Sequence, residues 1–362
     1  MRILVIAPPW FPVPPTGYGG IEQVVSLLAD GLVGRGHEVT LLAAGGSRTR
    51  ARLWTTCERP PSELIGAAAV ELAHVLAGYR HREHFDVIHD HTLTGPPLGA
   101  MPGGPPVVHT LHGPWTAVMA ELYRRLSDRV HLVAISHDQA ARVPPGITLA
   151  AVVHNGIDVA AHPFIVEKGE HLAYVGRCNA DKAPELAVEV ARRLDRSLRM
   201  AVKINEDAER AYFDEVVAPR LDGVDVEVLP NAGWKAKTEL MATAAVVLFP
   251  IRWPEPFGLV PLEANACGTP VVAFAEGALP EVVEHGRTGV LVPPGDLDGL
   301  CRAVEPASRL DPRDCRARAQ EHFDAQRMVR AYESLYERVA GGGTVVVAHE
   351  SGVTGAPGVR AG

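Results

Sequence analysis

Short apolar runs rich in valine and isoleucine alternate with segments of helical periodicity along most of this chain. Arg2–Ala7 is such a run and predicts a buried strand. A loop rich in proline and glycine follows at Pro8–Gly20, and Ile21–Val33 then repeats apolar residues at helical spacing. Because Glu38–Ala44 is again strand-like, these segments predict two parallel strands joined by a right-handed helical crossover.

This unit recurs in two series, one on each side of the segment Ile157–Glu170. The first series has further predicted strands at Asp86–His89, Val107–Leu111, His131–Ile135 and Leu149–Val153, and predicted helices at Ser62–Tyr79 and Thr116–Leu126. The second has predicted strands at Leu172–Val175, Arg199–Lys203, Val224–Leu229, Ala245–Phe249, Val271–Ala273 and Val290–Val292, and predicted helices at Ala183–Leu194, Glu206–Ala218, Lys235–Thr243 and Gly258–Ala266. We therefore predict an α/β protein with two tandem Rossmann-like, doubly wound parallel-sheet domains. Such domains bind ligands at the carboxyl ends of their strands, so the cleft between the domains is the expected site.

Composition limits the partners and the compartment. Lysine and arginine form no run in a chain of net charge −8, which argues against a nucleic-acid partner. The five cysteines are scattered singly, a pattern that favours reduced thiols in the cytoplasm and speaks against a zinc site. The start MRILVIAPPW is unlike a signal peptide, and no apolar run approaches the ~20 residues that span a bilayer. We expect a cytoplasmic protein without integral membrane contact.

The most informative stretch begins at Arg252 and reads RWPEPFGLVPLEANACGTPVVA. Glu255 lies in a proline-rich turn after a predicted strand, and Gly258 is expected to begin a short helix that contains Glu263. Free backbone N–H groups at a helix start bind anions, whereas carboxylates before and inside the helix suit neutral hydroxyl groups. This one stretch therefore has the chemistry to bind a phosphate, a sugar and a ribose.

The stretch resembles the E-x7-E segment of retaining glycosyltransferases of the GT-B fold, in particular glycosyltransferase family 4. The resemblance rests on PFG after Glu255 and ACGTPVVA after Glu263, and it extends over almost the whole chain to about Ala340. It implies a GT-B fold, with residues 1–157 on the acceptor side of a cleft and residues 158–324 on the nucleotide-sugar donor side.

The resemblance also gives an expectation for the end of the chain. Asp311–Ala340 is predicted to be one or two helices, and residues 325–340 would cross back onto the first domain. Residues 341–362 are rich in glycine, alanine and valine, and we expect a disordered tail there. An edge strand at Thr344–Ala348 is the alternative.

Three shorter motifs agree with the same family. Gly17–Glu22 resembles its GG-x-E start, although a plain turn would have the same composition. Gly176-Arg177, followed by Lys182, resembles its G-R-x(n)-K signature, with Lys-Ala in place of the usual Lys-Gly. The sequence from Thr110 to Gly113 resembles T-x-H-G, and His154 stands where the family's P-N-G-V-D motif has proline.

The resemblance assigns roles to individual residues. Arg177 and Lys182 would bind the donor diphosphate and stabilise the negative charge that grows on it as the sugar leaves. The predicted catalytic set is His112, Arg177, Lys182 and Glu255, in which His112 contacts the sugar near its reacting carbon and Glu255 binds sugar hydroxyls. The predicted nucleotide-sugar-binding set is Gly19, Gly20, Leu229, Asn231, Phe257, Gly258, Leu259 and Glu263. In this set Glu263 binds the ribose and the base lies near the segment that ends at Asn231.

The implied reaction is retaining transfer of a sugar from a nucleoside-diphosphate sugar, of UDP or GDP type, to an acceptor hydroxyl. We expect no separate cofactor and no metal, and the leaving phosphate, not a protein carboxylate, would take the acceptor proton. A secondary metabolite or an oligosaccharide is the first expectation for the acceptor, and a lipid, thiol or polyol is the second. A nucleotide-sugar epimerase and a non-catalytic nucleotide-sugar-binding protein remain alternatives.

Two other polar patterns at strand and helix ends have simpler interpretations. His89-Asp90-His91 alternates across an extended strand and cannot chelate a metal as a unit, so we expect it in the wall of the cleft. Asp296-Leu297-Asp298 has the letters of a metal motif but begins a predicted helix, so helix capping is the favoured interpretation.

Overall fold

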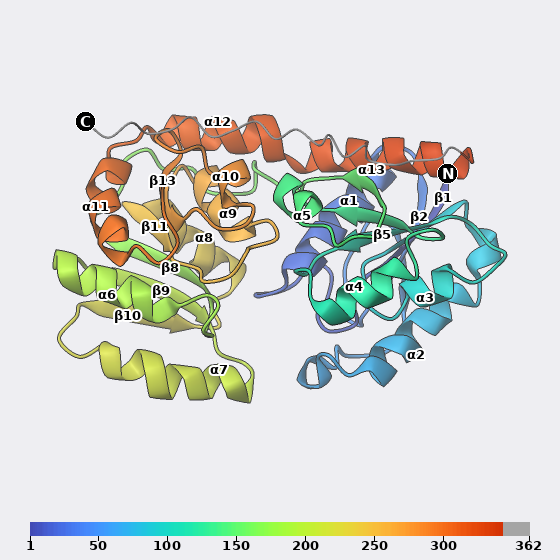
Figure 1. Ribbon diagram of the computed structural model, residues 1–362, viewed down its shortest axis with the longest axis horizontal. Coiled ribbons are helices and arrows are strands. Elements are labelled where there is room, and N and C mark those ends of the chain that lie inside the picture. The colour runs from blue at the N-terminus through green and yellow to red at the C-terminus, as the bar shows by residue number, and fades with distance from the viewer. Residues whose placement is uncertain (343–362) are drawn as a thin grey trace.

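The structure is a computed structural model that describes residues 1–342, which form two α/β domains lying side by side (Figure 1). Each domain contains one sheet, and every pair of neighbouring strands in both sheets is parallel. The two predicted Rossmann-like domains are thus confirmed. The predicted edge strand Thr344–Ala348, and all of the predicted tail beyond Gly342, lie outside the described residues.

The first domain has a seven-stranded sheet in the order β3-β2-β1-β4-β5-β6-β7. Its strands are β1 (Arg2–Ile6), β2 (Glu38–Ala43), β3 (Arg52–Thr55), β4 (Val87–Asp90), β5 (Val107–Leu111), β6 (His131–Ala134) and β7 (Leu149–Val152). Its α-helices are α1 (Gly20–Gly34), α2 (Ala68–Tyr79), α3 (Pro96–Gly99), α4 (Ala117–Arg124) and α5 (His137–Ala141). The order of the strands reverses between β1 and β4, which is where a doubly wound sheet binds its ligand.

The second domain repeats this plan with six strands in the order β10-β9-β8-β11-β12-β13. These are β8 (Leu172–Arg177), β9 (Leu198–Lys203), β10 (Val226–Pro230), β11 (Val246–Phe249), β12 (Val271–Phe274) and β13 (Gly289–Val292). The helices are α6 (Pro184–Leu194), α7 (Asp207–Tyr212), α8 (Trp234–Thr243), α9 (Leu259–Ala266), α10 (Leu279–Val282) and α11 (Leu297–Ser308). Here the order reverses between β8 and β11.

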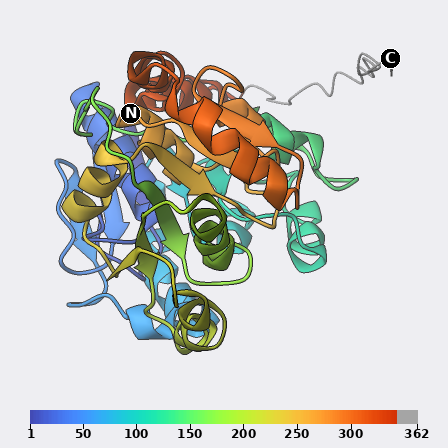
Figure 2. The ribbon, with the colours of Figure 1, turned by 90° about the vertical axis from the view of Figure 1, so that its left-hand side faces the viewer.

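Apolar side chains from alternate strand positions fill two layers in each domain, because successive residues of a strand point to opposite faces. In β8, Ala173 and Val175 pack with residues of α8 and α9, whereas Leu172 and Tyr174 pack with α6 and α11. Helices therefore cover both faces of the sheet (Figure 2). All four residues are at most 5% exposed, and each large apolar side chain contributes about 1.5–3 kcal/mol to stability.

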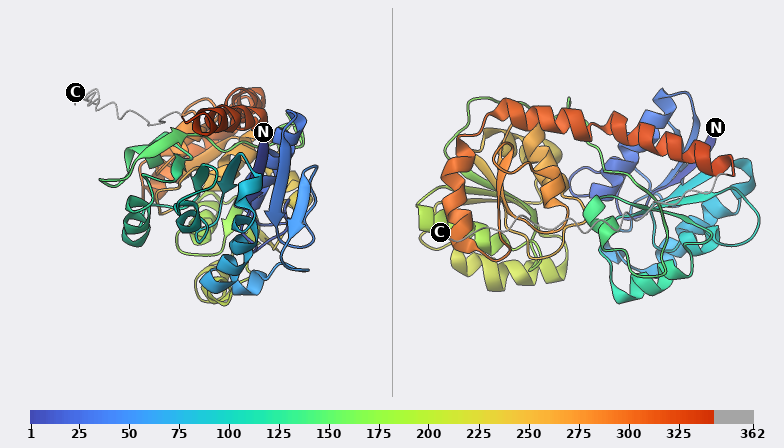
Figure 3. Two further views of the ribbon diagram at one scale, coloured as in Figure 1. Left: turned by 90° about the vertical axis from the view of Figure 1, so that its right-hand side faces the viewer. Right: turned by 45° about the horizontal axis from the view of Figure 1, so that its top comes forward.

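Two helices at the end of the described chain link the domains. α12 (Pro312–Phe323) packs on α9 of the second domain, and α13 (Ala325–Ala340) packs on α1 of the first (Figure 3). Asp324 lies between α12 and α13. Its carboxylate caps the start of α13 by accepting the Gln326 N–H. The chain passes from the first domain to the second near Ile157 and returns near Phe323. Ile157 donates its backbone N–H to the Phe323 carbonyl, so these two connecting segments are in contact.

Local sequence reasoning placed two helices wrongly and missed strand β3 and the short helices α3 and α10. The helix predicted from Ser62 begins at Ala68, because Gly66 adopts a left-handed backbone after a short 3-10 turn. The helix predicted at Glu206–Ala218 is α-helical only to Tyr212 and continues as a π-helical and then a 3-10 turn. Strand β3 was not predicted, since its side chains are mostly exposed and it has no apolar run. No helix within residues 1–342 is long and apolar enough to cross a membrane.

Candidate functional site

The loops at the two reversal points approach each other across the domain boundary. Gly17 in the loop after β1 lies beside Ala232, the ring of Tyr18 contacts Arg177, and Gly20 lies against Leu259. The predicted catalytic and donor-binding residues all belong to segments at the carboxyl ends of strands, as Rossmann-like domains require.

The glycine-rich loop ends in Gly19 and Gly20, where a larger side chain would collide with neighbouring residues. A Cβ on Gly19 would lie 2.7 Å from the Pro15 Cβ and 3.0 Å from a Glu22 carboxylate oxygen, and the Gly19 φ of 149° disfavours other residues. Gly20 begins α1, and a Cβ there would approach a Leu259 methyl group to 3.1 Å. The Glu22 side chain is buried in the first turn of α1, and this burial raises its pKa to about 7.

Arg177, the last residue of β8, lies in a network of opposite charges. Its Nε donates to Glu209 at 2.8 Å, and its Nη2 lies 3.1 Å from both Glu206 carboxylate oxygens. Lys203, at the end of β9, donates to the same two carboxylates. Tyr18, from the other domain, places its ring 5.9 Å from the Arg177 guanidinium and 5.0 Å from the Lys203 amine, within cation–π range.

Lys182 and Glu255 form an ion pair at the second reversal point, and both side chains are less than 20% exposed. The Glu255 oxygen that faces Lys182 also accepts the indole N–H of Trp253 at 2.8 Å. The Lys182 amine lies 4.9 Å from the centre of the Trp253 ring. Glu255 is therefore held in one orientation by two donors, which is the fixed geometry that a substrate-binding carboxylate needs.

Glu263 lies within α9, and the Lys237 amine of α8 donates to both of its carboxylate oxygens at 2.8 Å. Before α9, Phe257 is buried, and Gly258 has a φ of 100° that lets the chain turn into the helix. Pro261 removes no helical hydrogen bond, because it lies in the first turn. Glu255 and Glu263 thus flank the start of α9 as the sequence predicted.

The predicted base-binding segment ends β10. Asn231 has a left-handed φ of 53°, and its side-chain oxygen accepts the Ile204 backbone N–H at 2.8 Å. Since that side chain is already bound to the backbone of a neighbouring strand, it fixes the turn. Leu229, two residues earlier, is half-buried against the core of the second domain.

His112 follows β5, and its Nε2 lies 2.8 Å from His91 Nδ1. Burial lowers the pKa of His112 to about 3, so the ring is neutral at physiological pH. The prediction that His89-Asp90-His91 lines the cleft is wrong for its first two members. His89 is buried against Tyr336 of α13, and Asp90 accepts hydrogen bonds from Tyr79 and Thr92 inside the first domain.

Sequence reasoning missed several residues that complete these networks. They are Tyr18, Trp253, Glu206, Glu209 and Lys237, which contact predicted site residues directly, and Lys203, which binds Glu206 and Glu209. Lys203 could have been predicted as a site residue from the sequence, because it is the last residue of a predicted strand. Trp253 lies two residues before Glu255, where backbone turns bring neighbouring side chains together in ways that spacing alone does not reveal.

Glu281 of α10 makes a separate contact across the domain boundary. Its two carboxylate oxygens accept the backbone N–H groups of His137 and Asp138, and His154 Nε2 lies 2.8 Å from one of them. Although burial opposes it, the hydrogen bonds from His154 and the two amides lower the pKa of Glu281. His137, His154 and Glu281 could hold a metal ion by residue type and spacing, but their hydrogen bonds form a link between the domains.

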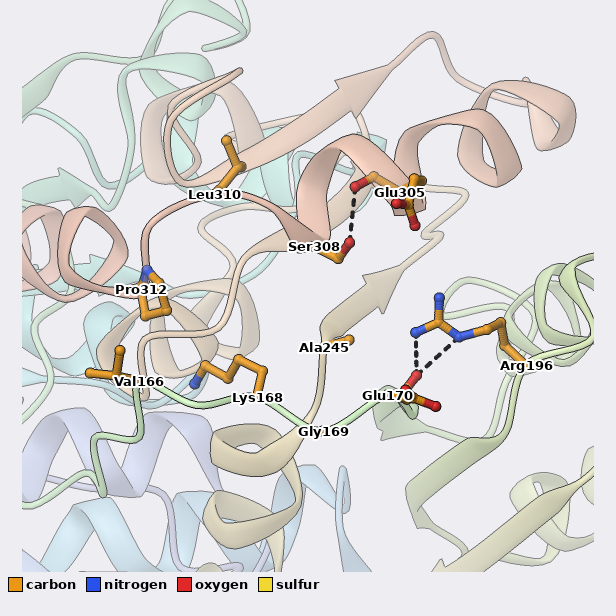
Figure 4. A pocket seen from close by; sticks show the side chains of 10 residues that line it. All are labelled: Val166, Lys168, Gly169, Glu170, Arg196, Ala245, Glu305, Ser308, Leu310 and Pro312. Atoms are coloured by element: carbon orange, nitrogen blue, oxygen red, sulfur yellow. Dashed lines mark hydrogen bonds between the residues drawn. The ribbon is translucent and has the colours of Figure 1, made fainter.

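Asp296 has the predicted capping role, because its side chain accepts the Gly299 N–H at the start of α11. A hollow of about 550 Å³ in the second domain is unrelated to these networks (Figure 4). It lies beside Glu170 and Ala245, which precede β8 and β11, at the sheet edge opposite Arg177. Lys168 in its wall already donates to three oxygen atoms.

Comparison with known proteins gives the family. Residues 18–161 match the model described as Glycosyltransferase Family 4, and residues 160–322 match the model described as Glycosyl transferases group 1. A D-inositol 3-phosphate glycosyltransferase of Kribbella flavida is 31% identical over 72% of this chain and 74% of its own length. The chain belongs to the glycosyltransferase family that these two models describe.

Two further relatives of this glycosyltransferase match over nearly full length. A glycogen synthase of Mycobacterium tuberculosis is 28% identical over 93% of this chain and 94% of its own. The crystal structure of AviGT4, a glycosyltransferase involved in avilamycin A biosynthesis, superimposes with a TM-score of 0.74 at 25% identity, covering 94% of this chain and 98% of that one. The expected GT-B fold is thereby confirmed.

Proposed function

We propose that this glycosyltransferase moves a sugar from a nucleoside-diphosphate sugar, of UDP or GDP type, to an acceptor hydroxyl with retention of configuration and without a metal ion. One observation carries the proposal. Two cations, Arg177 and Lys182, lie at the reversal point of the second sheet, and Lys182 is paired there with Glu255. The glycine-rich loop of the first domain meets this point, because Tyr18 contacts Arg177 and Gly20 lies against Leu259. The two cations can bind the phosphates of a donor, and the carboxylate of Glu255 beside Lys182 can bind the hydroxyl groups of its sugar.

The donor diphosphate binds Arg177 and Lys182. Arginine offers a planar fork for two phosphate oxygens and lysine a point charge, so the pair can neutralise a diphosphate at two places. The backbone N–H groups at the start of α9 and the glycine-rich loop add uncharged donors. Glu263 accepts ribose hydroxyls and Glu255 accepts sugar hydroxyls, with the base near the end of β10.

The acceptor oxygen forms a bond to the anomeric carbon while the bond from that carbon to the phosphate oxygen breaks. The acceptor proton moves to an oxygen of the leaving phosphate on the same face of the sugar. Arg177 and Lys182 stabilise the charge that the phosphate gains, and fixed cations in a site shielded from water do this with little reorganisation. Glu255 binds hydroxyls in this scheme and makes no bond to carbon.

We propose a secondary metabolite or an oligosaccharide as the acceptor. The similarity to AviGT4, which is involved in avilamycin A biosynthesis, supports this choice. The similarity to a D-inositol 3-phosphate glycosyltransferase supports a polyol as the second candidate. The first domain supplies the acceptor side, and the cytoplasm is the proposed compartment.

The function is tested first by thermal shift with UDP, GDP and their sugars, where a ligand at 100 Kd should stabilise the protein by ~2.7 kcal/mol. The stabilising donor is then incubated with candidate acceptors, with and without chelator, and the anomeric configuration of the product is read by NMR. Isomerised donor without transfer would indicate an epimerase, and binding without turnover a binding protein. Loss of transfer on chelation, restored by magnesium or manganese, would refute metal independence.

The placement of the diphosphate has its own test. Arg177→Ala should weaken binding of the nucleoside diphosphate strongly and of the nucleoside little. Arg199→Ala is the control, since this half-exposed arginine lies on β9 and pairs only with Glu227 among the ion pairs of the described residues. Equal loss of both ligands in Arg177→Ala would contradict the placement.

A further inference from the structure

His91 and His112 share a hydrogen bond at the ends of two adjacent strands. His91 follows β4, His112 follows β5, and these strands pair in parallel. His91 Nδ1 and His112 Nε2 are 2.8 Å apart, and the two rings are stacked with centroids 5.1 Å apart. Burial lowers the pKa of both rings, well below the usual range for His91, so both are neutral and each carries one proton.

The position of those protons follows from the other nitrogen of His91. His91 is 4% exposed, and its Nε2 is buried without a hydrogen-bond partner among residues 1–342. If His112 donated to His91, the His91 proton would be on Nε2 and an N–H group would be buried unpaired. If His91 donates from Nδ1, only a lone pair is buried unpaired. Orphaned buried N–H groups are the rarer and costlier case, so His91 is the donor.

This choice fixes the tautomer of His112. Its Nε2 accepts from His91, so its proton is on Nδ1, which makes no hydrogen bond within the described residues and belongs to a half-buried side chain. The backbone is held as well, because the Gln139 amide donates to the carbonyls of Leu111 and Gly113 on either side. Ring and backbone of His112 are therefore both fixed before substrate binds.

We propose that His91 is a positioning residue that holds the proton of His112 on Nδ1, so that His112 presents an N–H donor to an oxygen atom of the sugar substrate. The proposal rests on the proposed function for the identity of that oxygen, but the tautomer itself does not depend on it. Without His91, His112 can carry its proton on either nitrogen and would present a lone pair part of the time. A lone pair repels the oxygen that an N–H group binds.

Three variants separate this role from general stability. His91→Phe keeps an aromatic ring but removes the donor, whereas His91→Asn places an amide N–H near the position of Nδ1. His171→Phe is the matched control, because His171 is also buried with an unpartnered Nε2 but precedes β8 at the sheet edge opposite the site. Thermal melting of each variant shows that it is folded.

We expect His91→Phe to lower kcat roughly tenfold to a hundredfold, with donor KM and nucleotide binding unchanged. This loss is smaller than the roughly hundredfold to thousandfold cost of removing a donor outright, because His112 still donates part of the time. His91→Asn should recover most of kcat, and His171→Phe should retain all of it. Wild-type kcat in His91→Phe would overturn the proposal, as would equal losses in His91→Phe and His91→Asn.

The tautomer is measured directly by long-range proton–nitrogen NMR of protein labelled with ¹⁵N-histidine, with the His112 signals assigned from His112→Gln. We expect protonated Nδ1 in wild type and in His91→Asn, and a shift toward protonated Nε2 in His91→Phe. Protonated Nε2 in wild type would refute the proposal. Because this measurement needs no turnover, a protein that transfers no sugar would refute the proposed function alone.

Discussion

Glu22 is a buried acid whose ionisation should control the stability of the first domain. It is 4% exposed, and one carboxylate oxygen lies against the backbone of Gly19. No lysine, arginine or histidine within the described residues forms an ion pair with it, and only its own backbone N–H offsets the burial that raises its pKa from 4.5 to about 7. Glu22→Gln keeps the shape and removes the titration.

The sign and the size follow from the two pKa values. A carboxyl group that is harder to ionise in the folded protein holds its proton there while the unfolded chain releases it, so stability is highest below pH 4.5 and falls as the pH rises toward 7. With these values the group lowers the free energy of unfolding by about 1 kcal/mol at pH 5 and by about 3 kcal/mol at pH 8. Glu22→Gln should therefore gain roughly 2–3 kcal/mol relative to wild type between these pH values.

The assay is urea unfolding of wild type and Glu22→Gln at several pH values from 5 to 8, followed by circular dichroism and fluorescence. Coincident transitions are required before a free energy is assigned, since the chain has two domains. Glu321→Gln, at an exposed position of α12, is the control and should show no such trend. A difference between Glu22→Gln and wild type that stays constant from pH 5 to 8 would refute the reasoning.

Three other predictions follow from specific contacts. Glu255→Gln should mainly lower kcat, because a sugar contact can strengthen as the glycosidic bond breaks. Glu263→Gln should mainly raise donor KM, because a ribose contact is the same in the ground state and the transition state. The reverse pattern in steady-state kinetics would show that the donor lies in the opposite direction in the cleft. Trp253→Phe should lower kcat about tenfold by removing the indole bond to Glu255, with nucleotide affinity, measured by calorimetry, unchanged. Gly31→Ala places a Cβ 2.5 Å from a Val329 methyl carbon and should cost about 1–3 kcal/mol in denaturant unfolding, which Val329→Ala should relieve.

The sequence predicts the fold well where one physical signal dominates. β1 and β8 are apolar because parallel strands are covered on both faces, so each is recognisable without knowledge of its neighbours. β3 carries no such signal, since an edge strand owes its conformation to pairing with β2. The α-helix predicted through Phe213 was wrong because apolar periodicity does not register Pro219, which cannot donate a helical hydrogen bond and lies in the 3-10 turn that follows.

The site is predicted less completely, for a different reason. Arg177, Lys182 and Glu255 were found because they lie at strand ends or within a family motif, and the structure brings Lys182 and Glu255 together. Sequence spacing gives no distance between strands, so the pairing of Glu263 with Lys237 and the stacking of His91 on His112 could not be predicted. The same limit explains why His89 was placed in the cleft wall, when α13 covers it.

Under the proposed function, donor binding is an exchange of partners, because Arg177, Lys182, Glu255 and Glu263 are already paired with opposite charges. Arg177 binds two carboxylates that differ in exposure and in their other partners. Glu209 is 2% exposed and is held by Lys203 and by the Asn205 N–H, whereas Glu206 is 35% exposed. A diphosphate can therefore displace Glu206 while Glu209 keeps the guanidinium in place. The carboxylates thus hold the cation oriented, and the net gain on binding is smaller than the gross attraction between cation and phosphate.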